Sequence, residues 1–293
     1  MNNKPTRYEL QIIEEIKKGT PKKPKNFFSN LFDNVNESLN KASSWLGNIP
    51  GVDTILNQVQ DRTVRLFQDF SKKSFSSKEV IEKYAEAGFP QIKSTDDVGS
   101  LSLEEVEQVA KELRKKYLTL AQDSEEDSGN DASDIIALIT LNQQAISEYA
   151  AAYGFDINLE QERLFALNIM EYAASDDAAT RQAVLSRMLK VAHEISTKST
   201  AGTNAAKPTF FDTLRTMSSS VSIRLLKAKI GEVVPIAGAV IGGGFNAYFT
   251  HEVSDIAQLL YRKRFLLEKY GKDVFKIEEG KDKNKQKQED DES

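Results

Sequence analysis

The spacing of the apolar residues constrains the fold of this chain more than any other feature. Almost every apolar stretch repeats at intervals of three and four residues, the period of an α-helix, and very little of the sequence alternates as a strand would. In residues 27–46 one helical face carries Phe28, Leu31, Phe32, Val35, Leu39, Ala42 and Leu46. The sequence therefore predicts an all-α protein.

The predicted helices and loops indicate a single large helical domain over residues 27–272. Its helices include 27–46, 52–70, 135–153, 178–197 and 252–270, and its predicted loops are an acidic stretch over 122–134 and a linker-like stretch over 196–208. Residues 1–26 are predicted to be a flexible segment with a short helix, and 273–293 a disordered charged tail. With 293 residues the chain is long enough to bury a sizeable core.

Three helix ends carry capping signals. Ser102 and Glu105 are spaced as a capping box, in which each side chain bonds the backbone N–H of the other residue. Asn158 and Gln161 are predicted to cap the following helix in the same reciprocal way. Gly154 is predicted to end the preceding helix in a left-handed conformation.

Composition excludes several classes of function. The net charge of -5 argues against general nucleic-acid binding, because phosphate contact needs clustered cations. The chain has no cysteine, which removes disulfides, thiolate nucleophiles and cysteine metal sites. Its N-terminal residues are polar and charged, without an apolar core of signal-peptide length, so we expect a cytoplasmic protein.

A glycine-rich segment over 233–250, VVPIAGAVIGGGFNAYFT, allows three interpretations. As a membrane span it is short and has charged flanks. As a dinucleotide-binding turn it lacks the flanking strands, because the sequence that follows is helical. Gly238 and Gly242 lie four residues apart, so another helix can approach closely, and Asn246 continues their row. This spacing favours a tightly packed C-terminal helix or helical hairpin.

Two blocks of the sequence resemble the EcsC family of bacterial proteins. Residues 150–170 are similar to the family's Tyr-Gly-x-Asp turn and the Glu- and Arg-rich helix after it, and residues 233–249 to its Pro-x-x-Gly-Ala-x-x-Gly-x-x-x-Asn segment. The matching residues are Tyr153, Gly154, Asp156, Glu162, Arg163, Pro235, Gly238, Ala239, Gly242 and Asn246. The resemblance covers residues 52–267.

This resemblance implies a helical protein that is cytoplasmic or peripheral to a membrane. The family's namesake is encoded beside an ABC transporter, so the resemblance also suggests a membrane transporter or a secretion process as a partner. One departure concerns the helix that leads into the Tyr-Gly turn. Family members often carry an apolar, glycine-rich stretch before the Asp that opens this helix, whereas here an acidic stretch precedes Asp134.

No catalytic set, cofactor motif or metal site is predicted. His193 and His251 have no ligand-like spacing to other residues. Asp156 and Glu162 could form an acid pair across the Tyr-Gly turn, which would suit an unrecognised hydrolase. The favoured interpretation is that Asp156 caps a turn and Glu162 pairs with a nearby cation on the surface.

A ligand site is hypothesised at Gly238, Gly242, Asn246 and Asp255. Asn246 and Asp255 are polar residues on an otherwise apolar or small-residue helix, where an unpaired polar group would be costly. They either satisfy helix ends or line a polar floor under an apolar pocket, and hydrogen bonding within the fold is favoured.

The helix over 27–46 is a candidate for membrane contact. Phe27, Phe28 and Trp45 would be interfacial anchors, and three lysines precede them at positions 22, 23 and 25. The helix itself is not basic, so core packing is the favoured alternative. We therefore expect a non-enzymatic protein on the inner face of the cell membrane, or one that binds a lipid-like apolar ligand. The alternative is a protein partner of a transporter.

Overall fold

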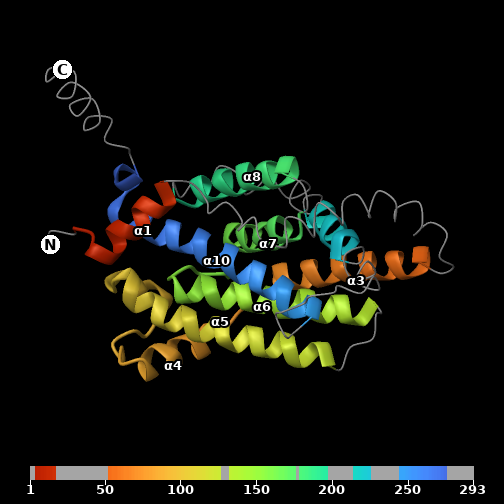
Figure 1. The fold of residues 1–293 in the computed structure, drawn as a ribbon, viewed down its shortest axis with the longest axis horizontal. Helices are drawn as coiled ribbons and strands as arrows, with labels where there is room; N and C mark the ends of the chain where they lie inside the picture. Colours follow the sequence, from red (N-terminus) through yellow and green to blue (C-terminus); the bar gives the residue numbers. More distant parts are fainter. Residues whose placement is uncertain are drawn as a thin grey trace, which may run out of the picture.

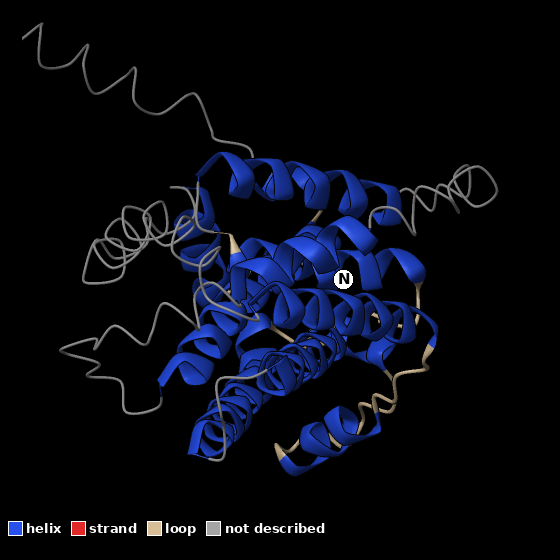
Figure 2. Cartoon of the chain, turned by 90° about the vertical axis from the view of Figure 1, so that its right-hand side faces the viewer, coloured by secondary structure: helices blue, strands red, loops and turns tan. Residues whose placement is uncertain are grey.

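The computed structural model describes residues 4–17, 52–126, 132–175, 178–196, 214–225 and 244–275. All regular structure in these ranges is helical, and Figure 2 shows no strand among them, which confirms the predicted all-α class. The elements are α1 (Arg7–Lys17), α3 (Val52–Lys72), α4 (Lys78–Glu86), η1 (Thr95–Ser100), α5 (Leu103–Glu126), α6 (Ala132–Ala152), α7 (Glu160–Ala174), α8 (Ala178–Ser196), a helix over 214–225, α10 (Gly244–Tyr270) and η3 (Lys272–Phe275).

Helix α10 is the centre of the bundle. In Figure 1 it crosses the middle of the fold, with α7 and α8 on one side and α4 and α5 on the other. The Asn246 side chain, near the start of α10, donates to Ser124 Oγ near the end of α5 at 3.2 Å. Lys269, near the end of α10, donates to the carbonyl of Leu101, just before α5. The two helices therefore run antiparallel along their whole length.

Helix α6 runs parallel to α10. Asn142 Nδ2 donates to Thr250 Oγ1 at 3.1 Å, and the ring of Tyr153, one residue beyond α6, stacks on Tyr261 at 6.3 Å between centroids. Both pairs are 108 residues apart in sequence, so the two helices keep one register. The side chains of this interface are among the most buried in the described part of the chain.

The predicted acidic loop over 122–134 is shorter than expected. Helix α5 continues to Glu126 and α6 begins at Ala132, so only 127–131 lie outside the described residues. Ala121 is buried and Ser124 bonds α10, which holds the acidic end of α5 in helical form. Tertiary contacts therefore outweigh the low apolar content of this stretch.

Of the predicted caps, one pair is wrong. Ser102 N–H donates to Glu105 Oε2 at 2.7 Å and Glu105 N–H to Ser102 Oγ at 3.3 Å, as the capping box requires. Helix α7 instead starts after Leu159, which offers no side-chain cap. The Asn158 amide is engaged elsewhere, because it accepts from the N–H of Phe75 at 2.8 Å and donates to its carbonyl at 3.1 Å.

The glycine-rich segment enters the described structure at Gly244. Residues 244–250 and the separately predicted helix over 252–270 form one continuous helix, α10. Pro235, Gly238, Ala239 and Gly242 lie outside the described residues. So do the predicted helix over 27–46, the linker-like residues 197–208 and most of the predicted tail, from 276 to 293.

Hydropathy adds one finding. Within the described ranges, no helix combines the length and the apolar composition that a membrane crossing requires.

Gly154 ends α6 as predicted, with φ at +86°. A Cβ at this position would also lie 3.1 Å from the Thr95 carbonyl oxygen and 3.3 Å from Val98 Cβ. The glycine therefore meets two needs, a left-handed backbone and the close approach of η1.

We predict that Gly154→Ala destabilises the protein by about 2–4 kcal/mol, the sum of left-handed strain and overpacking. Gly88 is the matched control, because its φ is +94° and a Cβ there would meet nothing within 4 Å. Gly88→Ala should cost only about 1–2 kcal/mol. Urea unfolding of both variants measures the difference, and equal losses would show that the approach of η1 is unimportant.

Candidate functional site

The residues that match the family's Tyr-Gly block lie at a junction of four helices. Tyr153, Gly154, Asp156, Glu162 and Arg163 occupy the turn between α6 and α7 and the first turn of α7; we call this set the Tyr-Gly junction. Its side chains reach α3 and α10 as well as the two helices it connects. The hydrogen bonds and ion pairs of these side chains determine whether the junction can do chemistry.

Asp156 and Glu162 do not form an acid pair. Asp156 is exposed, and its Oδ1 accepts from the backbone N–H and the side-chain amide of Asn158, both at 2.9 Å. Glu162 is only 2% exposed, and its two oxygens accept from the two terminal nitrogens of Arg264 on α10 at 2.6 and 2.7 Å. Glu162 thus has a cationic partner, but one that is buried and 102 residues away rather than on the surface.

Arg264 is held by aromatic rings as well as by charge. Its guanidinium carbon lies 4.0 Å from the ring centroid of Phe155 and 4.5 Å from that of Phe165. Burial alone would lower the pKa of Arg264, but the hydrogen bonds and charge of Glu162 outweigh burial and raise it. Arg264 therefore stays charged inside the bundle.

Arg163, the neighbour of Glu162, is committed to a different helix. Its Nε donates to the carbonyl of Ile157 at 2.9 Å, and a terminal nitrogen donates to the carbonyl of Ser71 in the last turn of α3. A cation at this place satisfies carbonyls that a helix C-terminus leaves unpaired. The Glu-Arg pair of the motif therefore ties α7 to both α10 and α3.

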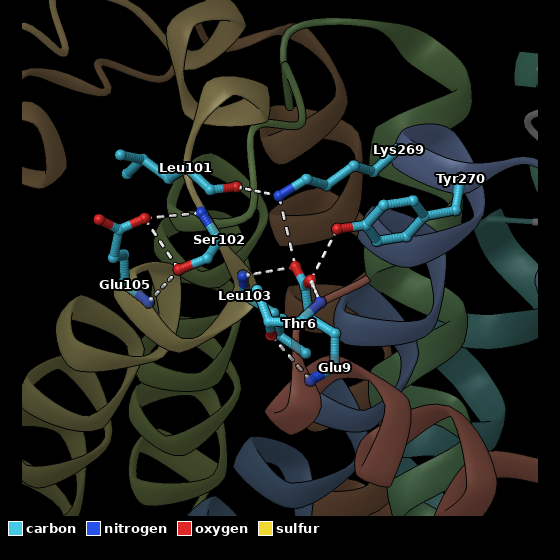
Figure 3. Close-up of polar contacts among 8 residues, drawn as sticks. All are labelled: Thr6, Glu9, Leu101, Ser102, Leu103, Glu105, Lys269 and Tyr270. Atoms are coloured by element: carbon cyan, nitrogen blue, oxygen red, sulfur yellow. Dashed lines mark hydrogen bonds and ion pairs between the residues drawn. The ribbon is translucent and has the colours of Figure 1, made fainter. Parts of the chain in front are cut away.

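A second buried carboxylate holds α1 in place (Figure 3). Glu9 is fully buried and accepts from Thr6 N–H at 2.7 Å, Leu103 N–H at 3.0 Å and the Tyr270 hydroxyl at 2.6 Å. Lys269 Nζ lies 3.3 Å away. Because Leu103 opens α5, the carboxylate also sits at the positive end of that helix.

A third buried carboxylate, Glu107 of α5, completes the set. Arg262 Nε forms an ion pair with Oε1 of Glu107 at 2.6 Å, and the Tyr8 hydroxyl donates to its other oxygen. Burial, followed by the hydrogen bond and charge of Glu107, raises the pKa of Tyr8 to about 12. We call the three ion pairs of α10 with Glu107, Glu162 and Glu9 the α10 clamps; their cations are Arg262, Arg264 and Lys269.

Every buried glutamate among the described residues is ion-paired. Beyond the clamps, Glu148 pairs with Lys116 at 3.1 Å and Glu171 with Arg187 at 2.8 Å. Each of these ion pairs joins two different helices, so the five carboxylates connect the bundle.

The two described residues of the predicted ligand site are not brought together. Asn246 is buried against α5, whereas the Asp255 side chain is 49% exposed and bonds Arg114. Nine residues along a helix correspond to two and a half turns, which places the two side chains on opposite faces. Gly238 and Gly242 lie outside the described residues, so their role stays a prediction.

His251 lies in the same surface group. Its Nε2 is 2.8 Å from Arg114 Nη2, and because a guanidinium only donates, that nitrogen accepts and Nδ1 faces Asp255 at 3.3 Å. In the described part of the chain no group of three or more potential ligands could hold a metal ion. The side chain of His193 lies outside that part.

Comparison with known proteins gives the family. A model described as the EcsC protein family matches residues 7–266. The chain belongs to the EcsC protein family. It is also 25% identical over 142 residues to "Uncharacterized protein YdbA" of Bacillus subtilis (strain 168), a match over 47% of this chain and 48% of that protein. The chain therefore spans about half the length of this curated relative, and no solved structure matches it significantly.

The EcsC match begins at the first residue of α1 and ends in the last turns of α10. The EcsC region therefore includes α1, although the sequence resemblance was traced only from residue 52. The clamp residues Glu9, Glu107, Arg262 and Arg264 lie within the match, and Lys269 lies beyond it. Arg264 was not identified from the sequence, although one feature could have pointed to it. Arg264 shares an apolar helical row with Tyr261 and Phe265, and a charge in such a row needs a buried partner.

We predict that Glu162→Gln costs about 3–5 kcal/mol of unfolding free energy, because Arg264 is left buried without its counter-charge. The double variant Glu162→Gln/Arg264→Met should recover part of this loss, since no unpaired charge remains. Chemical denaturation measures both.

The exposed pair Lys78–Glu82 provides the control for this experiment. Its side chains are 81% and 59% exposed, so Glu82→Gln should change stability by no more than about 0.5 kcal/mol. A similar small effect for Glu162→Gln would contradict the importance of the buried pair.

Glu9 should make stability depend on pH. Burial raises its pKa, but the Tyr270 hydroxyl, the two backbone amides and the nearby ammonium together outweigh burial, so the pKa lies below its ordinary value of 4.5. A lowered folded-state pKa gives stability that is complete above the unfolded-state value and is lost as pH falls through the folded-state value.

We therefore predict that native protein loses stability more steeply between pH 6 and pH 3, an interval of about three units around the ordinary carboxyl value, than Glu9→Gln does. Urea midpoints across this range are the measurement. Glu15→Gln, on the exposed face of the same helix, is the control and should keep the native slope. If Glu9→Gln shows the native slope too, the network does not carry this dependence.

Proposed function

We propose that this EcsC family protein is a non-enzymatic helical protein that associates peripherally with a membrane surface. The observation that carries the non-enzymatic part is the pairing of all five buried glutamates among the described residues. The hydrolase alternative required Asp156 and Glu162 to act together. One of them is bonded within its own turn and the other is neutralised by Arg264.

The membrane part of the proposal rests on the sequence between α1 and α3. Phe27, Phe28 and Trp45 supply aromatic side chains suited to the interface of a bilayer, and the lysines at 22, 23 and 25 suit anionic headgroups. The flanking helices α1 and α3 both pack on the bundle, so this stretch of 34 residues is attached to a folded framework at both ends.

A lipid-like ligand is the second form of the same proposal. The glycine-rich residues 238–243 precede α10, whose first turns bury Phe245 and Phe249 with their rings 6.3 Å apart. An apolar ligand held by the residues before α10 would adjoin this aromatic part of the core. Native mass spectrometry of the protein purified without detergent tests this form, and a co-purified lipid is the expected result.

We predict that native protein floats with vesicles that contain anionic lipid, and that Phe27→Ser/Phe28→Ser/Trp45→Ser lowers the bound fraction about tenfold, a loss of roughly 1.4 kcal/mol or more. Raising the salt concentration should weaken binding further, because lysine–headgroup attraction is screened.

The described surface offers a matched control. Leu10, Leu120 and Leu159 are exposed by 50%, 42% and 50%, so their replacement by serine removes three exposed apolar side chains from the described part of the chain. That variant should float like native protein. If native protein does not float at all, the membrane proposal is wrong, and crosslinking in cells then tests the remaining alternative, a transporter subunit as partner.

A further inference from the structure

The face of α10 that packs on α5 and α6 carries a row of polar side chains. Asn246, Thr250, Ser254 and Gln258 recur at every fourth position, which places them in one row along the helix. The first three are 0–1% exposed. We call these four residues the polar seam. Helix interfaces in globular bundles are usually filled by Leu, Ile and Val, so a buried row of polar side chains is unusual there.

Asn142 of α6 faces this seam. Its Nδ2 donates to the carbonyl of Leu138 at 2.9 Å and to Thr250 Oγ1 at 3.1 Å. The amide cannot be turned over, because Oδ1 would then lie against the Leu138 carbonyl and two acceptors would oppose each other. Asn142 Oδ1 is therefore the atom that remains to be satisfied.

Asn142 is 0% exposed, and its Oδ1 has no hydrogen-bond partner among the protein groups around it. A buried acceptor without a partner costs about 1–3 kcal/mol. The parallel register places Ser254 one turn beyond Thr250, on the side toward Tyr149. The Tyr149 hydroxyl and Ser254 Oγ are likewise buried without a hydrogen-bond partner among the protein groups, so unsatisfied polar atoms follow one another along the seam.

We propose that the polar seam binds ordered water, with one molecule donating to Asn142 Oδ1 between α6 and α10. The acceptor and its neighbours Thr250 and Ser254 are all neutral, so a charged ligand would be desolvated there without a counter-charge. The side chains are fully buried, so only a very small molecule can reach the acceptor without separating the helices. Water supplies the missing donor and keeps 2–4 hydrogen bonds of its own, as buried water does.

This water site also accounts for the parallel register of α6 and α10. A Leu–Leu interface can slide by a turn with little change in contacts, whereas a bonded amide and its water fix one offset. Polar groups buried in helix interfaces select a register in this way in coiled coils. The proposal is independent of membrane binding, because every residue it uses lies within the described helices.

A crystal structure of the full chain at high resolution tests the site directly. We expect electron density for a water molecule within hydrogen-bonding distance of Asn142 Oδ1. The result that would overturn the proposal is a direct bond from a protein donor to Oδ1, for instance from the Tyr149 hydroxyl, or a dry seam.

A second measurement does not depend on crystals. Oxygen-17 relaxation dispersion counts long-lived internal water molecules, and Asn142→Leu/Thr250→Val should lose at least one relative to native protein. Thr63→Val is the matched control: Thr63 is also fully buried, its hydroxyl bonds Val59 O at 2.8 Å on α3, and its loss should leave the count unchanged. An unchanged count in the double variant would refute the site.

The melting temperature separates this site from a simple cavity. Because the double variant replaces both hydrogen-bonding side chains with apolar groups of similar shape, its melting temperature should equal or exceed the native value. A fall, with folded spectra retained, would show that packing rather than water governs this interface.

Discussion

The ion pair of Glu162 with Arg264 is the interaction on which the rest of the structure depends. It is buried between α7 and α10, bidentate, and enclosed by Phe155 and Phe165. A charge pair in such a place offsets its desolvation only when its geometry is good, which leaves little tolerance for sliding or rotation of either helix. The Tyr-Gly turn lies just before Glu162, and the cations of the other two α10 clamps lie on either side of Arg264 along α10.

The two halves of α10 are held by different kinds of contact. Toward its C-terminus, three cations meet carboxylates from α5, α7 and α1, so charge fixes this end from three directions. Toward its N-terminus, small polar side chains and the rings of Phe245 and Phe249 make the contacts. The family match spans both parts, and in sequence the glycine-rich block leads directly into the half of α10 that has no such clamps.

Local sequence signals predicted the helical fold well, but they did not predict which side chains bond across different helices. The three-and-four spacing gave the all-α class, and Gly154 and the Ser102 box gave helix ends, because each depends on residues within one turn. Asn158 shows the limit: its sequence suits a cap, yet its amide bonds Phe75, 83 residues away. The partner of Glu162 could not be found by local reasoning either, since nothing near residue 162 specifies Arg264.

The docking of α1 sets the order in which the chain can finish folding. Glu9 takes its hydroxyl partner from Tyr270 and its ammonium partner from Lys269, about 260 positions later in the chain. Contacts so distant in sequence form late, because the loop between them must close first. Leu103 and Glu107 of α5 can contact α1 earlier, but the carboxylate of Glu9 gains all its partners only once the end of α10 is in place. The position of α1 is therefore completed late in folding.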